Sequence, residues 1–217
     1  MSTPNKPIHR HESITGFYSD ALKNFGDSSK GVGWKNDQAQ DVRFEQLAKV
    51  ITIKSDFTVN DLGCGTGKFY KFLLDRGYQP SVFQGYDILD EMVEAAKKAL
   101  LPDAAVKIAK ITAPSEMTMA DYSVESGIFN VKYDAKESEW LHNVLSTIEA
   151  MNEKSRLGFA FNMLTKYSDK EFMQSYLYYA DPAFMFDYCK RNFSKNVALL
   201  HDYDQYDFTI LVRKNPQ

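Results

Sequence analysis

The chain has 217 residues, of which 44% are hydrophobic and 25% charged, and a formal net charge of −3 at pH 7. The length and composition predict one globular domain with a full-sized core. The net negative charge does not favour binding of nucleic acid, so we expect a small-molecule partner. Two cysteines make no disulfide framework, and no apolar run approaches the ~18 residues of a membrane span, so we expect a cytoplasmic protein with no membrane partner.

The first 55 residues are expected to form a helical lid that precedes the first strand. Apolar residues recur at three- and four-residue steps over residues 12–25 and again over residues 36–51, which predicts two amphipathic helices. Glycine, aspartate and serine over residues 26–33 separate the two helices.

A glycine-rich stretch follows over residues 59–67, which read Val-Asn-Asp-Leu-Gly-Cys-Gly-Thr-Gly. It predicts a strand that ends in a tight turn, because glycine tolerates positive φ and lets a ligand reach the backbone. The apolar spacing over residues 68–76 predicts a helix that leaves this turn. A phosphate-binding loop would need Lys-Ser or Lys-Thr after the glycines, and a dinucleotide loop would read G-x-G-x-x-G rather than G-x-G-x-G. Asp61, two residues before the first glycine, would repel a pyrophosphate but suits a ligand with an ammonium group.

A second acidic residue follows at the end of the next predicted strand, over residues 81–87. Asp87 lies twenty residues after Gly67. A carboxylate at the end of such a strand can accept hydrogen bonds from both hydroxyls of a ribose. A helix is predicted over residues 90–100, with Met92 on its inner face.

Together these motifs resemble the class I S-adenosylmethionine-dependent methyltransferases. The resemblance covers about residues 59–132 and, more weakly, the C-terminal hairpin. It is carried by Asp-Leu-Gly-Cys-Gly-Thr-Gly from Asp61, Gly-Tyr-Asp-Ile from Gly85, and Met-Val-Glu-Ala-Ala from Met92. It implies S-adenosylmethionine as the cofactor and methyl transfer as the reaction. The expected fold is a three-layer α/β Rossmann-like sheet with strand order 3-2-1-4-5-7-6, strand 7 antiparallel, and N-terminal helices.

The resemblance also implies which residues contact the cofactor. Asp87 is expected on the ribose, and Ile88 and Met92 on the faces of the adenine. Many relatives carry an aspartate after the third strand for the adenine amino group, but here only the backbone or Thr112 is available. The expected cofactor-binding residues are Trp34, Arg43, Asp61, Gly63, Cys64, Gly65, Gly67, Asp87, Ile88, Met92, Ile111, Thr112, Ser126 and Gly127.

Two of these residues come from the predicted lid. Trp34 and Arg43 could reach the methionine end of the cofactor, where a guanidinium fork suits a carboxylate. The alternative is that Trp34 is a packing anchor and Arg43 a charge on the surface of its helix.

The remaining elements complete a single domain over residues 1–217. It divides into the lid at 1–55, the cofactor-binding core at 56–165, a helical substrate insertion at 166–195 and a C-terminal hairpin at 196–217. Strands are predicted over residues 104–109, 119–129, 157–164, 196–201 and 206–213, and helices over residues 136–154, 168–179 and 182–193.

The candidate catalytic residues are His201 and, as a second choice, Asn130. His201 falls at the carboxyl end of the sixth strand, where its ordinary pKa would suit a general base, although it could equally cap the hairpin. His142 is expected on a helix that covers the far flank. The substrate-binding residues are expected to be Tyr178, Tyr179, Asp181, Tyr203 and Tyr206. No His/Cys cluster has the spacing of metal ligands, so no metal is expected.

The predicted function is therefore methyl transfer to an oxygen or nitrogen of a small polar metabolite, such as a sugar or another secondary metabolite. Residues 125–130 lack the Asn/Asp-Pro-Pro-Tyr sequence by which adenine-N6 and glutamine-N methyltransferases hold a planar nitrogen. Two alternatives stay open. One is a protein or RNA methyltransferase, which a basic groove would mark, and the other is a non-catalytic module that binds S-adenosylmethionine.

Overall fold

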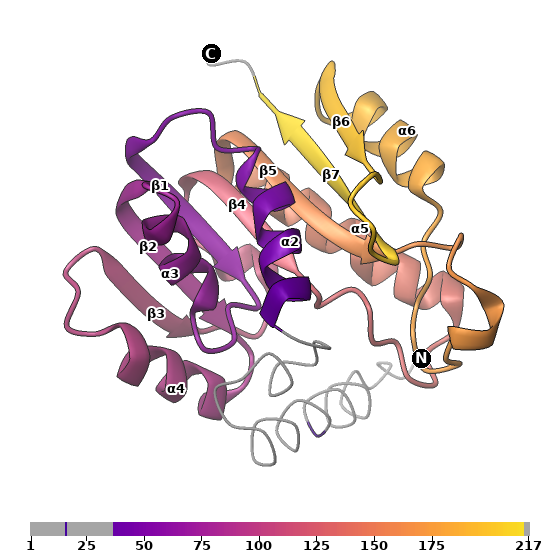
Figure 1. Ribbon diagram of the computed structural model, residues 1–217, viewed down its shortest axis with the longest axis horizontal. Helices are drawn as coiled ribbons and strands as arrows, with labels where there is room; N and C mark the ends of the chain where they lie inside the picture. Colours follow the sequence, from indigo (N-terminus) through magenta and orange to yellow (C-terminus); the bar gives the residue numbers. More distant parts are fainter. Residues whose placement is uncertain (1–15, 17–36, 215–217) are drawn as a thin grey trace, which may run out of the picture.

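A seven-stranded sheet organises the fold, in the order β3-β2-β1-β4-β5-β7-β6 (Figure 1). The computed structural model describes residue 16 and residues 37–214. The strands are β1 (Ser55–Leu62), β2 (Gln79–Asp87), β3 (Val106–Lys110), β4 (Ala120–Ser126), β5 (Ser155–Leu164), β6 (Asn196–Leu200) and β7 (Asp207–Arg213). Strands β1 to β5 pair in parallel, and β7 runs antiparallel to both β5 and β6. The predicted order and the antiparallel strand 7 are confirmed.

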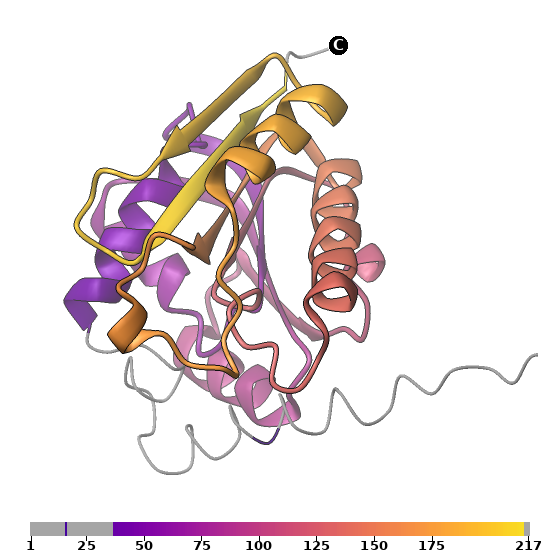
Figure 2. The same cartoon turned by 90° about the vertical axis from the view of Figure 1, so that its right-hand side faces the viewer.

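Helices cover both faces of the sheet. They are α2 (Asp37–Ala48), α3 (Lys68–Asp75), α4 (Asp90–Leu100), α5 (Glu137–Glu153) and α6 (Pro182–Asn192), with short 3₁₀ helices η2 (Pro114–Glu116) and η3 (Lys170–Phe172). Figure 2 shows α5 and α6 on one side of the sheet and α2 on the other. No helix in the described part of the chain is long and apolar enough to cross a membrane.

Side chains of the sheet alternate between two hydrophobic cores, as the two-residue repeat of a strand requires. On β1, Phe57 and Val59 are fully buried in the core that α2 and α3 share, whereas Leu62 belongs to the core beneath α5 and α6. Asp61 follows the alternation of Phe57 and Val59, so the fold aims it toward the α2 side at the carboxyl end of β1.

Hydrogen bonds hold the connection from β3 to β4, where the described chain has only the three-residue helix η2. Gln84 Nε2 donates to Asn60 Oδ1 at 2.9 Å, and Asn60 Nδ2 donates to the carbonyl oxygen of Thr118 at 2.8 Å. The hydroxyls of Tyr86 and Thr118 lie 3.1 Å apart. These polar contacts tie the connection to β1 and β2.

The prediction of a helix over residues 168–179 is wrong. Only η3 forms there, because the end of this segment bonds to the loop after β4 instead of continuing a helix. The carbonyl oxygen of Tyr176 accepts from the N–H groups of Lys132 and Tyr133 at 3.0 and 2.9 Å, and Tyr178 N donates to Asn130 O at 2.9 Å. The predicted helical insertion thus contains one full helix, α6, and an extended segment.

The N-terminal part of the prediction lies mostly outside the described residues. This applies to the helix expected over residues 12–25, of which only Gly16 is described, as helical, and to most of the proposed lid. The helix expected over residues 36–51 is present as α2, which ends three residues earlier than predicted.

Candidate functional site

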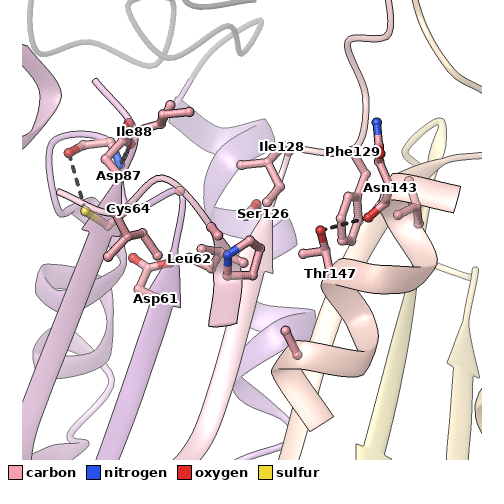
Figure 3. Close-up of a pocket in the computed structure, with 18 of the residues that line it drawn as sticks. Asp61, Leu62, Cys64, Asp87, Ile88, Ser126, Ile128, Phe129, Asn143 and Thr147 are labelled. Atoms are coloured by element: carbon pink, nitrogen blue, oxygen red, sulfur yellow. Dashed lines mark hydrogen bonds between the residues drawn. The ribbon is translucent and has the colours of Figure 1, made fainter. Parts of the chain in front are cut away.

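A cavity of about 1330 Å³ opens at the carboxyl ends of β1, β2 and β4 (Figure 3). In parallel α/β sheets this edge is where ligands bind, because the loops there leave a crevice between the two helical layers. The predicted cofactor residues that line the cavity are Asp61, Gly63, Cys64, Gly65, Asp87, Ile88, Met92, Ile111, Thr112, Ser126 and Gly127. The fold therefore brings together residues from four separate loops that the sequence nominated one by one.

The glycine loop turns the chain sharply between β1 and α3. Gly63, Gly65 and Gly67 have φ angles of 77°, 53° and 81°, which is the left-handed region that side chains disfavour. A Cβ atom on Gly63 would lie 2.3 Å from Cγ2 of Ile128, and one on Gly67 would lie 2.4 Å from Cδ1 of Leu100. Gly67 is the residue that caps α3 and is not part of the cavity wall.

Asp87 is held in place by the loops on either side of it. Its Oδ2 accepts from Gly65 N at 3.0 Å, and its Oδ1 accepts from Leu89 N at 3.0 Å. Burial raises the pKa of Asp87, and these backbone hydrogen bonds oppose that rise. The carboxyl group is thus fixed at the cavity wall with lone pairs left to accept from a ligand.

Asp61 is a buried acid at the edge of the cavity. Its exposed fraction is 4%, and no backbone or side-chain group in the described part of the chain donates a hydrogen bond to its carboxyl group. Burial and, second, the negative charge of Asp87 raise the pKa of Asp61 to about 8. A cationic group in the cavity would relieve both effects, which is the fit expected for a ligand with an ammonium group.

Helix α5 forms a second wall of the cavity. His142, Asn143 and Thr147 line it, and Figure 3 shows Asn143 and Thr147 on the helix across from Asp61. The expectation that the helix of His142 covers a far flank is wrong, because His142 lines the same cavity as Asp61. The sequence held a usable signal, since no amphipathic helix pattern occurs between residues 111 and 119.

Arg43 is not among the cavity-lining residues. Its Nη2 forms a buried ion pair with the carboxylate of Asp207, and its Nη1 donates to Ala39 O at 2.6 Å. Neither reading of the sequence matches this placement, because the guanidinium is neither at the cavity nor on the surface. Gln40 and Phe44, on the same helix, line the cavity instead. Trp34 lies outside the described residues.

Asn130 joins three loops and does not line the cavity. Its Oδ1 accepts from Leu164 N at 3.0 Å, and its carbonyl oxygen accepts from Tyr178 N at 2.9 Å. These bonds tie the loop after β4 to the end of β5 and to the segment before α6. The placement suits a structural role better than the catalytic one expected from the sequence.

The other acceptor-side candidates also lie outside the cavity wall, on the two loops that follow β5 and β6. His201 is exposed, and its ring centroid is 6.2 Å from those of Tyr167 and Phe208. Asp181 caps α6 by accepting from Ala183 N at 3.0 Å. The remaining candidates are Tyr179, Tyr203 and Tyr206, which bond within these loops or to β7, and Tyr178, whose backbone N–H donates to Asn130 O in the loop after β4.

Over residue 16 and residues 37–214, no group of three or more His, Cys, Asp or Glu side chains could hold a metal ion.

Comparison with known proteins gives a relative by sequence and several neighbours by fold. No protein-family model matches the chain. A Mycobacterium tuberculosis H37Rv protein named "Putative methyltransferase Rv1506c" is 46% identical over 166 residues, which cover 76% of this chain and 98% of that protein.

Two solved structures illustrate the shared fold. Magnesium protoporphyrin IX methyltransferase (ChlM) from Synechocystis PCC 6803, with bound S-adenosylhomocysteine, has a TM-score of 0.62 at 17% identity and covers 97% of this chain and 100% of its own. Haemonchus contortus phosphoethanolamine N-methyltransferase 1, in complex with phosphoethanolamine and S-adenosylhomocysteine, has a TM-score of 0.64 at 10% identity and covers 98% of this chain and 50% of its own. With this sheet order and a methyltransferase relative at 46% identity, the chain belongs to the class I S-adenosylmethionine-dependent methyltransferases.

Proposed function

We propose that the protein transfers the methyl group of S-adenosylmethionine to an oxygen or nitrogen atom of a small polar metabolite, such as a sugar. The observation that carries this proposal is the size and lining of the cavity. At about 1330 Å³ it exceeds the roughly 300–1,000 Å³ of a pocket for one drug-sized ligand, so a cofactor and an acceptor fit together.

The residues of the cavity suit S-adenosylmethionine at the glycine-loop end. Asp61 would pair with the ammonium group of the methionine part, and Asp87 would accept from the ribose hydroxyls. Ile88 and Met92 would pack on the adenine, and Gly65 would leave room for the ligand against the backbone. The two acids support the assignment because both line the same cavity: Asp61 is buried there without a hydrogen-bond donor in the described chain, and Asp87 is held by Gly65 N and Leu89 N.

When bound, the cofactor supplies an activated methyl group on a sulfonium, so the protein has mainly to orient the acceptor for in-line displacement. An amine acceptor needs only to be neutral, whereas a hydroxyl must lose a proton. His142 supports a base on the cavity wall, and His201 supports one at the rim of the same sheet edge. The α5 wall is the proposed acceptor side of this cavity. The loops that carry Tyr178 and Tyr203 do not line it, and acceptor contacts there stay a prediction.

A small-molecule acceptor is favoured over a protein or RNA by two further observations. The net charge of −3 does not favour an anionic polymer. The second wall of the cavity carries hydrogen-bonding side chains such as Glu139, Asn143 and Thr147, which suit a hydroxylated ligand. We place the enzyme in the cytoplasm, in keeping with Cys64 and Cys189, which are both free buried thiols.

Titration calorimetry followed by a turnover assay tests the proposal. The protein should bind S-adenosylmethionine and S-adenosylhomocysteine but neither NAD nor ATP. Methyl release should then be measured over a panel of sugars, amines and phenols, with peptides and RNA as comparison. Failure to bind S-adenosylmethionine would overturn the proposal, turnover of only peptide or RNA would replace the acceptor class, and binding without any turnover would indicate a non-catalytic module.

A further inference from the structure

Glu125, near the end of β4, is a fully buried acid that takes no part in the cavity wall. Its exposed fraction is 0%, and its Oε1 accepts from Ile128 N at 2.6 Å. The backbone N–H groups of Gly127 and Phe129 also stabilise its charged form, although burial still raises its pKa well above the ordinary value. A buried carboxyl group is costly, so a strand position that needed only volume would be better filled by leucine.

The loop that Glu125 holds is part of the cavity. Gly127, Ile128 and Phe129 all line it. Cγ2 of Ile128 occupies the space next to Gly63, only 2.3 Å from where a Cβ atom on that glycine would lie. Ile128 therefore contacts the glycine loop directly, and its position sets the width of the cofactor end of the cavity.

The same loop is anchored from the opposite side by α5. Trp140 Nε1 donates to Phe129 O at 2.8 Å, and Figure 3 shows Phe129 between Ile128 and α5. The next residue, Asn130, bonds to Leu164 N and Tyr178 N. The loop over residues 127–130 is thus the one connection, within the described chain, that touches the glycine loop, α5 and the segment before α6 in four consecutive residues.

We propose that Glu125 is a positioning residue. Its carboxylate accepts hydrogen bonds from the backbone N–H groups of residues 127–129 and thereby holds Ile128 against Gly63. The inference rests on the proposed function, because the loop that Glu125 supports lines the cavity proposed to hold cofactor and acceptor. Without the Glu125 carboxylate the loop would keep its hydrogen bond from Trp140 Nε1 but lose the hydrogen bonds that its own N–H groups donate to Glu125. The loop would then move away from the glycine loop and widen the site.

Three variants separate this role from simple packing. Glu125→Gln keeps the acceptor oxygen and closely resembles a protonated carboxyl group. Glu125→Leu keeps most of the volume but removes the acceptor. Glu125→Asp keeps the chemistry but shortens the reach by one methylene. Ser123→Ala is the matched control, since Ser123 is also fully buried, lies on the same face of β4 and bonds only to Asn60 and Ser155.

The first measurement is amide hydrogen exchange in the ligand-free protein. Exchange at residues 127–129 should be about tenfold faster or more in Glu125→Leu, and at parent rates in Glu125→Gln and Ser123→Ala, since a lost hydrogen bond of ~1.5 kcal/mol corresponds to about that factor. If Glu125→Leu does not fold, Glu125→Asp should show the same selective change. Parent rates at residues 127–129 in the folded Leu or Asp variant would overturn the proposal.

The second measurement is calorimetric affinity for S-adenosylhomocysteine together with kcat and KM. Glu125→Leu should lose affinity several-fold and lower kcat more than it raises the KM for the acceptor, and Glu125→Gln should rescue both. Equal losses in Glu125→Gln and Glu125→Leu would also refute the role. If the parent protein binds no S-adenosylhomocysteine, the proposed function fails, while the exchange data still decide whether Glu125 holds the loop.

Discussion

Asp61 leads to a prediction that can be worked out quantitatively. Burial and the charge of Asp87 raise its pKa to about 8 in the ligand-free protein. At pH 7 the carboxyl group is then about 90% protonated. A ligand ammonium beside it favours the charged form, so binding of S-adenosylhomocysteine at pH 7 should release close to one proton.

The affinity should depend on pH in a defined direction. If the ligand requires ionised Asp61, affinity rises about tenfold per pH unit below pH 8 and levels off above it, which gives about a 100-fold gain from pH 6 to pH 9. In the ligand-free protein the sign is opposite for stability. Because the folded pKa is raised above the ordinary 3.8, this group's contribution is full below about pH 4 and is lost as the pH rises through 8.

Calorimetry in buffers of different ionisation enthalpy counts the released protons directly. The charge of Asp61 interacts with three other titratable groups, Asp87, Cys64 and Glu125. The matched controls are therefore Asp61→Asn and Asp87→Asn. Asp61→Asn should bind more weakly, release fewer protons than the parent on binding, and lose less stability than the parent between pH 5 and 8. Proton release that is undiminished in Asp61→Asn, or a parent affinity that does not change between pH 6 and pH 9, would refute the reasoning.

Three further predictions follow from the site and its support. Asp87→Ala should weaken S-adenosylhomocysteine binding by about 10- to 100-fold in calorimetry, the range for a charge-assisted hydrogen bond, and an unchanged affinity would remove Asp87 from the site. His142→Ala should lower kcat on a hydroxyl acceptor by about 10²–10⁴-fold, and His201→Ala should lower it by less, because of these two histidines only His142 lines the cavity. A larger loss of kcat in His201→Ala than in His142→Ala would place the base at the hairpin. Arg43→Met should lower the free energy of unfolding in urea by about 3–5 kcal/mol, because it leaves the Asp207 carboxylate buried without its ion pair. The double variant Arg43→Met with Asp207→Leu should lose less, and a loss below ~1 kcal/mol for the single variant would contradict this.

The fold and the cofactor end of the site could be predicted because their signals are local in sequence. The glycine spacing, the acid before it and Asp87 all lie within 27 consecutive positions, from Asp61 to Asp87. Right-handed crossovers then leave few ways to order the parallel strands. The terminal hairpin could only add antiparallel strands at the free edge, and β7 does pair antiparallel with β5.

The α5 wall was not predicted because it depends on what is missing between two strands. His142 and Asn143 line the cavity together with Pro114 and Ser115 of the three-residue helix η2. The segment over residues 168–179 failed for a related reason. Its apolar spacing allowed a helix, but hydrogen bonds to Lys132 and Tyr133, more than forty residues earlier, gave its backbone better partners.

Arg43 shows most clearly where local reasoning ends. An arginine on an amphipathic helix next to a glycine-loop fold suits either a cofactor carboxylate or solvent, and both alternatives leave its charge hydrated or paired with a ligand. The actual partner, Asp207, is 164 residues away and becomes adjacent only after the antiparallel β7 has been placed beside β5. Because both groups are buried, each makes the other tolerable in the core, and together they fix α2 over β7. Helix α2 also contributes Gln40 and Phe44 to the cavity wall. The Arg43–Asp207 ion pair therefore keeps Arg43 away from the cavity and also positions the helix that forms one wall of that cavity.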